Sequence, residues 1–323
     1  MPKVFWKDKK VLITGYEGFV GSHLTKKLLS LGADVFGIDI ITERKETILT
    51  QKDLAQITII KASVSEYKIV ENIIKENKIQ VVFHLAAEAI VGECLKKPLN
   101  AFSSNIKGTW NILEVCRQSD TVNCVITASS DKAYGEQQLP YKEDSPLKGQ
   151  HPYDVSKSCA DLLSQSYFQT YDLPVAITRC GNIYGPGDYN FSRIVPDAVR
   201  CAILSREFLI RSNGLFTRDY IFIDDIVEGY IMLAENLNRE NLAGEAFNFS
   251  NEKPISVVEL VEEIYRIAKQ EPNYKILNEV KCEIKDQYLS SSKAKGILKW
   301  QPKYTLQDGL KKTILWYFKN VNK

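Results

Sequence analysis

The sequence has 323 residues, of which 44% are hydrophobic and 25% are charged, as in an ordinary soluble globular enzyme. Its 42 basic and 40 acidic residues leave a net charge of +2 without a long block of one sign, which gives no reason to expect nucleic acid or an anionic membrane surface as a partner. No apolar run approaches the roughly 20 residues of a membrane span, and the N-terminus lacks the apolar core of a signal peptide. We therefore expect a cytoplasmic protein with a small-molecule ligand.

The cysteines and histidines argue against disulfides and metal chemistry. The cysteines are Cys94, Cys116, Cys124, Cys159, Cys180, Cys201 and Cys282. They are widely spaced and form no Cys-x-x-Cys pair, which is typical of reduced cytoplasmic thiols. None of His23, His84 and His151 pairs at helical spacing with another potential ligand. The sequence therefore predicts no metal site.

Short apolar runs alternate with longer segments of helical spacing from Lys10 to about Pro174. The runs are KVLIT, ADVFGI, ITIIK, VVFHL, VNCVIT and PVAIT, and between them apolar residues recur every three or four positions. Continuously apolar strands are buried on both faces, so the pattern predicts an α/β fold of the Rossmann type, a doubly wound parallel sheet between layers of helices.

The regular alternation of apolar runs and helical segments ends after RCGNIYGPGD, where glycine and proline cluster and shorter mixed elements follow. This change predicts a dinucleotide-binding domain over residues 1–180 and a smaller mixed α/β substrate lobe over residues 181–323, with some exchange of chain between them. The last segment, LQDGLKKTILWYFKN, has amphipathic helical spacing, and we expect it to cover an edge of the core.

The segment KVLITGYEGFVGSHLTKKLLSLGADVFGID places Gly15, Gly18 and Gly21 between a predicted strand and a predicted helix. The glycines permit a tight turn and close approach of the backbone to a pyrophosphate, whose charge then faces the helix N-terminus. Asp39 ends the next strand, where its carboxylate can accept hydrogen bonds from ribose hydroxyls and repel a 2'-phosphate. The loop therefore predicts a dinucleotide site that favours NAD over NADP.

In HPYDVSKSCADLLSQSY, Tyr153 and Lys157 are four residues apart and so lie on one face of a predicted helix. An ammonium beside a tyrosine favours the phenolate, so the two side chains together can move a proton. Such spacing is common in surface helices, but here it follows a dinucleotide loop and a polar strand end, and ligands collect at the carboxyl ends of parallel strands. We therefore predict that Tyr153 and Lys157 are catalytic.

The Gly-x-x-Gly-x-x-Gly loop and the Tyr-x-x-x-Lys pair resemble the short-chain dehydrogenase/reductase superfamily, particularly its extended branch. The resemblance implies that Tyr153 is the base of hydride transfer and that Lys157 also holds the nicotinamide ribose. It implies that Ser130 hydrogen-bonds the reacting hydroxyl. Further residues expected to line the cofactor are Phe19, Val20, Ser63, Val64, Leu85, Ala86 and Ala87. Ser63 stands where relatives often have an aspartate against the adenine.

The segment SSDKAYG puts Asp131 and Lys132 directly after Ser130, at the end of the predicted strand VNCVIT. Sugar-nucleotide 4-epimerases of the extended branch use only Ser or Thr, Tyr and Lys, because they return the hydride to the carbon that lost it. A 4,6-dehydratase oxidises carbon 4, which acidifies the carbon 5 proton, loses water from carbon 6 and returns hydride to carbon 6. This elimination needs an acid and a base, and dehydratases carry them at these two positions.

Longer blocks narrow the resemblance to nucleotide-sugar 4,6-dehydratases, most closely the CDP-glucose 4,6-dehydratase group. They are FWKDKKVLITG, SSDKAYG, YKEDSPLKGQHPYDVSKSCADLLSQSY and RCGNIYGPGDYNFSRIVPDAVR. The resemblance implies an NAD-dependent lyase that converts CDP-glucose to CDP-4-keto-6-deoxyglucose for deoxysugar synthesis. It also implies that Asn182, Arg193 and Arg218 face the substrate's nucleotide and diphosphate, which suits the bidentate donors of arginine.

Two positions near the expected substrate differ from these relatives. Dehydratases acting on dTDP-glucose or GDP-mannose have glutamate where this chain has Lys132, and a charged lysine cannot accept the carbon 5 proton. Lys132 either loses its charge beside the oxidised nicotinamide or stabilises the enolate while another group takes the proton. Glu88 replaces a common glutamine. We expect a solvated, inert side chain there, with pairing to Lys132 or a role as base as the alternatives.

Two other functions fit the sequence less well. A 4-epimerase of the same fold has no need of Asp131, and a non-catalytic NAD-binding protein has no chemical need for Ser130, Tyr153 and Lys157 together. The expected partners are a nucleotide-diphosphate hexose and further copies of the chain, with no nucleic acid or membrane. By analogy with the extended branch we expect a homodimer or a dimer of dimers, packed through the helices of NAFSSNIKGTWNILEVCRQ and CADLLSQSYFQTY.

Overall fold

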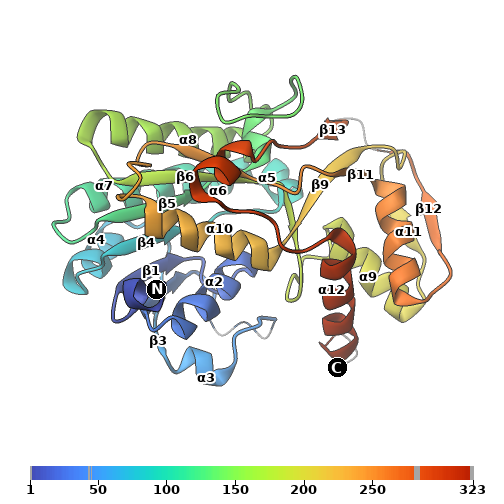
Figure 1. Cartoon of the computed structure of the whole chain (residues 1–323), viewed down its shortest axis with the longest axis horizontal. Helices are drawn as coiled ribbons and strands as arrows, with labels where there is room; N and C mark the ends of the chain where they lie inside the picture. Colours follow the sequence, from blue (N-terminus) through green and yellow to red (C-terminus); the bar gives the residue numbers. More distant parts are fainter. Residues whose placement is uncertain (1, 43, 45, 280–283, 321–323) are drawn as a thin grey trace. The chain divides into compact units, whose positions relative to one another are not determined.

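The structure, a computed structural model, describes residues 2–42, 44, 46–279 and 284–320 (Figure 1). Cys282 lies outside these residues. The chain divides into two compact units: the first contains Met1–Gly135, Glu143–Arg179 and Val227–Phe247, and the second contains Glu136–Lys142, Cys180–Ile226 and Asn248–Lys323. The predicted assignment of separate cofactor and substrate domains stays a prediction. Among the described residues no helix has both the length and the apolarity needed to cross a membrane.

A sheet of seven strands, counted within the described residues, forms the centre of the first unit, in the order β10-β6-β5-β4-β1-β2-β3. The strands are β1 (Lys10–Thr14), β2 (Asp34–Asp39), β3 (Ile57–Lys61), β4 (Val81–His84), β5 (Cys124–Ala128), β6 (Val175–Cys180) and β10 (Ala246–Phe249). From β3 to β6 each strand pairs in parallel with its neighbour. The strand order reverses between β1 and β4, as in Rossmann folds, so the predicted fold class is confirmed.

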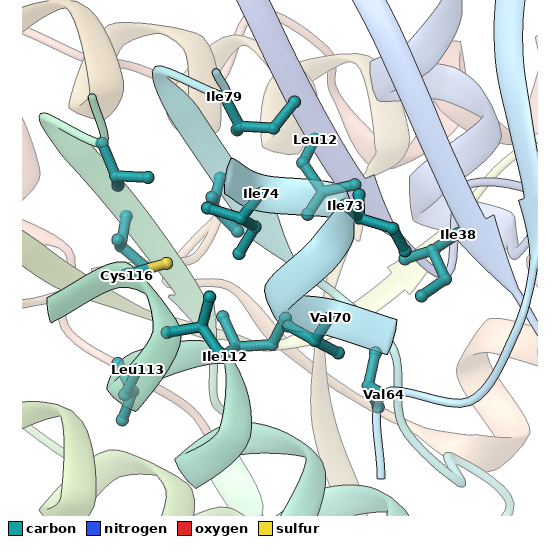
Figure 2. Close-up of a cluster of buried hydrophobic side chains, with 14 of the residues drawn as sticks. Leu12, Ile38, Val64, Val70, Ile73, Ile74, Ile79, Ile112, Leu113 and Cys116 are labelled. Atoms are coloured by element: carbon teal, nitrogen blue, oxygen red, sulfur yellow. The ribbon is translucent and has the colours of Figure 1, made fainter. Parts of the chain in front are cut away.

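One face of this sheet is covered by α4 (Tyr67–Glu76), α7 (Gly108–Arg117) and α8 (Pro152–Tyr171), as Figures 1 and 2 show. The buried cluster beneath them includes Leu12, Ile38, Val64, Val70, Ile73, Ile74, Ile79, Ile112, Leu113 and Cys116. Aliphatic side chains from both helices and strands interdigitate here, and their burial supplies the main stabilisation of the first unit.

The opposite face of the sheet packs on α1 (Pro2–Trp6) and α10 (Ile223–Asn236). The ring of Phe83 in β4 lies 6.0 Å from the ring of Trp6 and 6.4 Å from the ring of Tyr230, measured between centroids. Every residue of β4 is buried, and successive side chains of a strand point to opposite faces, so both faces of β4 are covered. This explains its continuous apolar run. The other helices of this unit are α2 (Phe19–Ser30), α3 (Gln51–Leu54), α5 (Val91–Lys96) and α6 (Pro98–Phe102).

A buried ion pair attaches α8 to the sheet. Arg179 of β6 donates from Nε and Nη2 to the Asp161 carboxylate at 2.7 and 2.9 Å, and from Nη1 to the Tyr134 hydroxyl at 2.8 Å. Tyr134 ends the 3-10 helix Asp131–Tyr134, which is separated from the end of β5 by two residues. The guanidinium therefore joins the helix that carries Tyr153 to the turn that carries Asp131.

The second unit combines short strands with three longer helices of its own among the described residues. Its elements are β7 (Asn182–Tyr184), α9 (Ile194–Leu204), β8 (Phe208–Ile210), β9 (Thr217–Phe222), β11 (Pro254–Ser256), α11 (Val257–Ala268), β12 (Tyr274–Ile276), β13 (Asp286–Gln287) and α12 (Leu306–Asn320). α12 packs on α9, α11 and β9 and buries Leu310, Ile314 and Tyr317. The predicted amphipathic C-terminal helix is confirmed.

Replacing Asp161 by Asn should lower the free energy of unfolding by about 3–5 kcal/mol, because Arg179 would keep a buried charge without its acid. The two side chains are only 0% and 2% exposed. Urea unfolding followed by tryptophan fluorescence measures the loss. The control Arg266→Gln breaks an exposed ion pair with Glu263 and should leave the unfolding midpoint unchanged. An equal midpoint shift in both variants would contradict the importance of the buried pair.

Candidate active site

The parallel strands of the first unit are in register at their carboxyl ends. The register pairs Thr14 of β1 with Ile38 of β2 and with His84 of β4, and it pairs His84 with Thr127 of β5. The loops that follow these strands therefore begin at one edge of the sheet. This carboxyl edge, next to the reversal of strand order, is where ligands bind in such folds.

The glycine loop after β1 fits a dinucleotide pyrophosphate. Gly15 has φ +72°, in the left-handed region, and a Cβ on it would lie 3.1 Å from the Cα of Ala86. A Cβ on Gly21 would lie 2.0 Å from the carbonyl oxygen of Gly15, so only glycine allows this close turn. Gly18 is the N-cap of α2, and Phe19 and Val20 form its first turn, whose N–H groups favour an anion.

Asp39 lies buried at the end of β2, where a ribose is expected. Its Oδ1 accepts the Ile41 N–H at 3.2 Å and lies 3.5 Å from an Arg44 guanidinium nitrogen. The Arg44 backbone N–H in turn donates to the buried carboxylate of Glu17 at 3.0 Å. Glu17 and Arg44 were not singled out from the sequence, because their contact joins two loops that are far apart in the chain.

Ser63 and Val64 follow β3 at the same edge of the sheet. The Ser63 hydroxyl accepts the Ser65 N–H at 3.2 Å, and the Val64 carbonyl accepts a hydrogen bond from Asn111 Nδ2 at 2.9 Å. These bonds hold the loop after β3 in place, and the predicted contacts of Ser63 and Val64 with the cofactor stay predictions.

The half-buried segment Leu85–Ala87 follows β4 and lies against Gly15. The N–H groups of Leu85 and Ala86 both donate to the hydroxyl of Thr14, at 3.1 and 3.0 Å. The segment is thereby attached to the strand that leads into the glycine loop. These contacts place the residues predicted to face the nicotinamide next to the predicted pyrophosphate loop.

Glu88, the next residue, is half-buried. Its carboxylate accepts the Ile90 N–H at 3.1 Å, which is a local turn interaction. Its backbone is held by Asn105, which accepts the Glu88 N–H at 2.7 Å and donates to the Glu88 carbonyl at 3.0 Å. The Glu88 side chain therefore takes part in a local turn at the site. That it has no role in the reaction stays a prediction.

Three predicted catalytic residues lie together in the turn after β5. Ser130 is the N-cap of the 3-10 helix, and its hydroxyl accepts the Lys132 N–H at 3.2 Å and donates to the Asp131 carboxylate at 3.0 Å. Asp131 is buried, whereas Lys132 is half-buried. Asp131, the expected acid, therefore contacts the Ser130 hydroxyl. This hydroxyl is expected to hydrogen-bond the reacting hydroxyl of the sugar.

Tyr153 and Lys157 lie one turn apart at the beginning of α8. The buried Lys157 ammonium donates to the carbonyl of Ala128, the last residue of β5, at 2.8 Å. Lys157 therefore reaches the strand end from which Ser130 follows after two residues. The structure brings these predicted catalytic residues to one sheet edge, and their roles toward cofactor and substrate stay predictions.

Asp154 is a buried acid beside the predicted catalytic residues. Burial raises the pKa of Asp154 above its ordinary value, and the Lys132 ammonium opposes this rise. The backbone N–H of His151, which donates to the Asp154 carboxylate, also opposes it, whereas the nearby Asp131 carboxylate adds to it. Asp131, Lys132 and Asp154 therefore form one electrostatic group.

The predicted substrate residues Asn182, Arg193 and Arg218 belong to the second unit. Asn182 Nδ2 donates to the Asp219 carbonyl at 3.4 Å, and Arg193 lies 3.1 Å from the Asp188 carboxylate. The guanidinium of the buried Arg218 donates to the carbonyls of residues 217, 284 and 285 at 2.8, 2.5 and 2.8 Å. The contacts of these three residues with a nucleotide and a diphosphate stay predictions.

Residues 12–313 match the model of the GDP-mannose 4,6 dehydratase family. The chain belongs to this family. It is 28% identical over 334 residues to the CDP-glucose 4,6-dehydratase of Salmonella typhimurium, covering 98% of this chain and 92% of that protein. It is 30% identical over 325 residues to the UDP-glucuronate 4-epimerase of Thermodesulfobacterium geofontis, covering 96% of each.

The fold is similar to a crystal structure of dTDP-glucose 4,6-dehydratase from Bacillus anthracis in complex with NAD. The TM-score is 0.87 at 26% identity, with 97% of this chain and 98% of that chain covered. The predicted class, an extended short-chain dehydrogenase/reductase of the nucleotide-sugar dehydratase and epimerase family, is confirmed. CDP-glucose as the substrate stays a prediction.

The structure adds residues that the sequence patterns did not single out. Asn105 holds the backbone of Glu88 from a π-helical segment, Ser103–Lys107, and Asp154 lies next to Lys132. Asn105 and Asp154 are buried polar residues of helical segments, and no pattern in the sequence marks their burial.

Replacing Gly21 by Ala should weaken NAD binding at least about tenfold, a loss of about 1.4 kcal/mol, because the new Cβ would displace the Gly15 turn. Isothermal titration of the apo-protein with NAD measures the dissociation constant. Gly296→Ala is the matched control, because a Cβ at Gly296 has no atom within 4 Å. A Gly21→Ala protein that remains folded by circular dichroism and binds NAD like the control would contradict the assignment of this loop.

Proposed function

We propose that this protein is an NAD-dependent nucleotide-sugar 4,6-dehydratase, a carbon-oxygen lyase. The observation that carries the proposal is the Asp131–Lys132 pair directly after Ser130. The buried Asp131 carboxylate accepts a hydrogen bond from the Ser130 hydroxyl at 3.0 Å, so an acid adjoins the expected position of the reacting sugar. A 4-epimerase has no elimination step in which to use this acid.

The cofactor is NAD, and the residues present fit it. The tight turn from Gly15 to Gly21 suits the close approach of a pyrophosphate, and the carboxylate of Asp39 suits the adenosine ribose. Bound NAD supplies reversible hydride chemistry and is regenerated in each turnover. Leu85–Ala87 form the expected nicotinamide side of this site.

Tyr153, Lys157 and Ser130 carry out the first proton transfer. Tyr153 removes the proton of the carbon 4 hydroxyl as hydride leaves carbon 4, and the Lys157 ammonium stabilises the phenolate. In the substrate complex the Ser130 hydroxyl turns from Asp131 to the oxygen that becomes the carbonyl and donates to it, and Asp131 enters the reaction in its protonated form. The position of Lys157 against the Ala128 carbonyl supports this arrangement, since it holds the ammonium at the end of β5.

Asp131 then serves the elimination. The carbon 5 proton leaves to a base, a carbon 5–carbon 6 double bond forms, and the carbon 6 hydroxyl takes the Asp131 proton and departs as water. Hydride returns to carbon 6 and a proton to carbon 5. Lys132 either takes the carbon 5 proton or stabilises the enolate while another group takes that proton.

The substrate is CDP-glucose, and the product is CDP-4-keto-6-deoxyglucose, an intermediate for deoxysugar synthesis. The similarity to the Salmonella typhimurium enzyme supports this substrate. Asn182, Arg193 and Arg218 contact its nucleotide and diphosphate.

The second candidate function is a nucleotide-sugar 4-epimerase, which the 30% identity to the Thermodesulfobacterium geofontis enzyme favours. The cysteines within the described residues are free thiols, which supports a cytoplasmic location.

Incubation of the purified protein with NAD and a panel of CDP-, dTDP-, GDP- and UDP-hexoses tests the function. Mass spectrometry should show that CDP-glucose loses the mass of one water. Loss of water from another hexose of the panel would support a dehydratase but show that its substrate carries a different nucleotide. An unchanged mass with an inverted hydroxyl in the NMR spectrum would favour the epimerase, and no change in any hexose would contradict both enzymes.

In the same assay, Asp131→Asn should lower the rate of dehydration by about 100- to 10,000-fold, the usual contribution of a general acid. It should still form enzyme-bound NADH, because oxidation of carbon 4 does not require the acid. NADH absorbance and product mass, measured together, separate the two steps. Tyr153→Phe is the comparison, since it should lose both signals. Dehydration at the wild-type rate in Asp131→Asn would exclude Asp131 from the mechanism.

We also propose that the protein is a homodimer, packed through α7 and α8, or a dimer of such dimers. Large apolar side chains on these two helices are exposed: Trp110 on α7, and Leu162 and Tyr171 on α8. α7 and α8 pack side by side, so two copies can form a four-helix interface. Burial of these exposed side chains would stabilise the assembly.

Leu162→Asp should convert the dimer to a monomer, because it places a charge in the apolar interface. Light scattering coupled to size-exclusion chromatography measures the mass. Leu315→Asp on α12 is the matched control, since Leu162 and Leu315 are 54% and 57% exposed. A monomeric wild type, or dissociation in the control alone, would contradict this interface.

A further inference from the structure

His84, the last residue of β4, is a buried histidine that the proposed chemistry does not use. It is 3% exposed and lies between two threonine hydroxyls. Its Nδ1 is 2.9 Å from the hydroxyl oxygen of Thr14 in β1, and its Nε2 is 3.0 Å from the hydroxyl oxygen of Thr109 in α7. A hydroxyl can donate or accept, so the position of the imidazole proton follows from the other bonds of each threonine.

The Thr14 hydroxyl must donate to His84. Its oxygen already accepts the N–H of Ala86 at 3.0 Å and the N–H of Leu85 at 3.1 Å, which is shared with the Thr14 backbone carbonyl at 3.3 Å. A hydroxyl oxygen has two acceptor sites and one proton, so the Thr14 proton is left for Nδ1 of His84. Nδ1 is therefore an acceptor and carries no proton.

The Thr109 hydroxyl must accept from His84. Its proton goes to the backbone carbonyl of Asn105, one turn earlier, at 2.6 Å. The remaining contact, with Nε2 of His84, then requires an N–H donor on the imidazole. These bonds define one arrangement of protons, in which His84 is neutral and protonated at Nε2.

The hydrogen bonds continue from Asn105 to the catalytic helix. Asn105 Nδ2 donates to the Ser156 hydroxyl at 2.9 Å, and this hydroxyl donates to the backbone carbonyl of Tyr153 at 2.7 Å. The same Asn105 amide holds the backbone of Glu88 on both sides. The polar relay is the set of residues Thr14, His84, Thr109, Asn105 and Ser156.

We propose that His84 is a positioning residue that, as the neutral Nε2–H tautomer, links the nicotinamide-side segment to the helix turn that carries Tyr153. Each member of the polar relay donates in the same direction, from the N–H groups of Leu85 and Ala86 to the Tyr153 carbonyl. The relay thereby sets the distance between the two groups that must act together in hydride and proton transfer. The inference rests on the proposed hydride-transfer site and is independent of which sugar nucleotide reacts.

The surroundings of His84 keep the imidazole neutral. Burial, and to a smaller extent the nearby Lys157 ammonium, lowers the pKa of His84 to about 3. A proton on Nδ1 would also face the Thr14 oxygen, whose acceptor sites are already used. The arrangement of the polar relay therefore stays the same across the pH range in which an ordinary histidine titrates.

The tautomer is tested on the intact protein by NMR of nitrogen-15-labelled histidine. Only three histidines occur in the sequence, so His84→Gln assigns the signal of His84 by its loss. We expect Nε2 protonated, Nδ1 unprotonated and no change in either shift between about pH 5 and pH 8, around the ordinary pKa of histidine. A charged ring or protonation at Nδ1 would overturn the inference, whatever the substrate is.

The positioning role is tested by cutting the relay at Thr109. Thr109→Val should lower the rate of NADH formation in a single turnover about 10- to 100-fold, with the nucleotide hexose that the wild type converts, because the link to Tyr153 is lost. The dissociation constant of NAD should change less, since Thr14 still binds His84, Leu85 and Ala86. Thr109→Ser keeps the hydroxyl and should restore the rate.

Thr313→Val is the matched control for Thr109→Val. Thr313 is also buried in a helix and donates to the carbonyl four residues earlier, Gly309, at 2.7 Å, but it lies in the second unit. Both variants remove a similar buried hydroxyl, and only Thr109→Val should slow the hydride step. An equal effect of the two variants on the rate, or no rescue by Thr109→Ser, would overturn the positioning role. If the wild type converts no hexose, the proposed function fails, while the NMR result still decides the tautomer.

Discussion

The shared register of the parallel strands is the constraint on which the site depends. Thr14, His84 and Thr127 lie in one row across β1, β4 and β5, so each strand releases its following loop at the same edge. The alternation of side chains has a period of two residues, so a shift of one residue would turn His84 to the other face of the sheet. The glycine loop, the Leu85–Ala87 segment and the turn of Ser130 meet because the apolar cores of these strands hold that register.

The attachment of α8 explains why its buried face is polar. Ser156, Lys157 and Asp161 are buried there, and each has a partner: Asn105, the Ala128 carbonyl and Arg179. Buried polar groups are costly without hydrogen bonds, so these contacts specify one position of the helix along the sheet. The exposed Leu162 reverses the usual amphipathic pattern, which is why helical spacing alone does not reveal the inward face of α8.

Much of the fold could be predicted from sequence because its signals are local. Each apolar run became a strand, and the spacing of Gly15, Gly18 and Gly21 indicated the turn before α2. The polar relay had no such signal, since Thr14, His84 and Thr109 become neighbours only when β1, β4 and α7 pack. The same holds for Arg218, whose bonds to the carbonyls of residues 284 and 285 depend on pairing between β9 and β13.

The 3-10 helix after β5 separates an acid from a cation that are adjacent in sequence. With about three residues per turn, successive side chains point about 120° apart, so Asp131 and Lys132 leave the 3-10 helix in different directions. Asp131 contacts the Ser130 hydroxyl, and Lys132 lies within electrostatic reach of Asp154. In the proposed mechanism, Asp131 would supply the proton to the leaving hydroxyl, and the positive charge of Lys132 would face the negative charge that develops at the carbonyl oxygen.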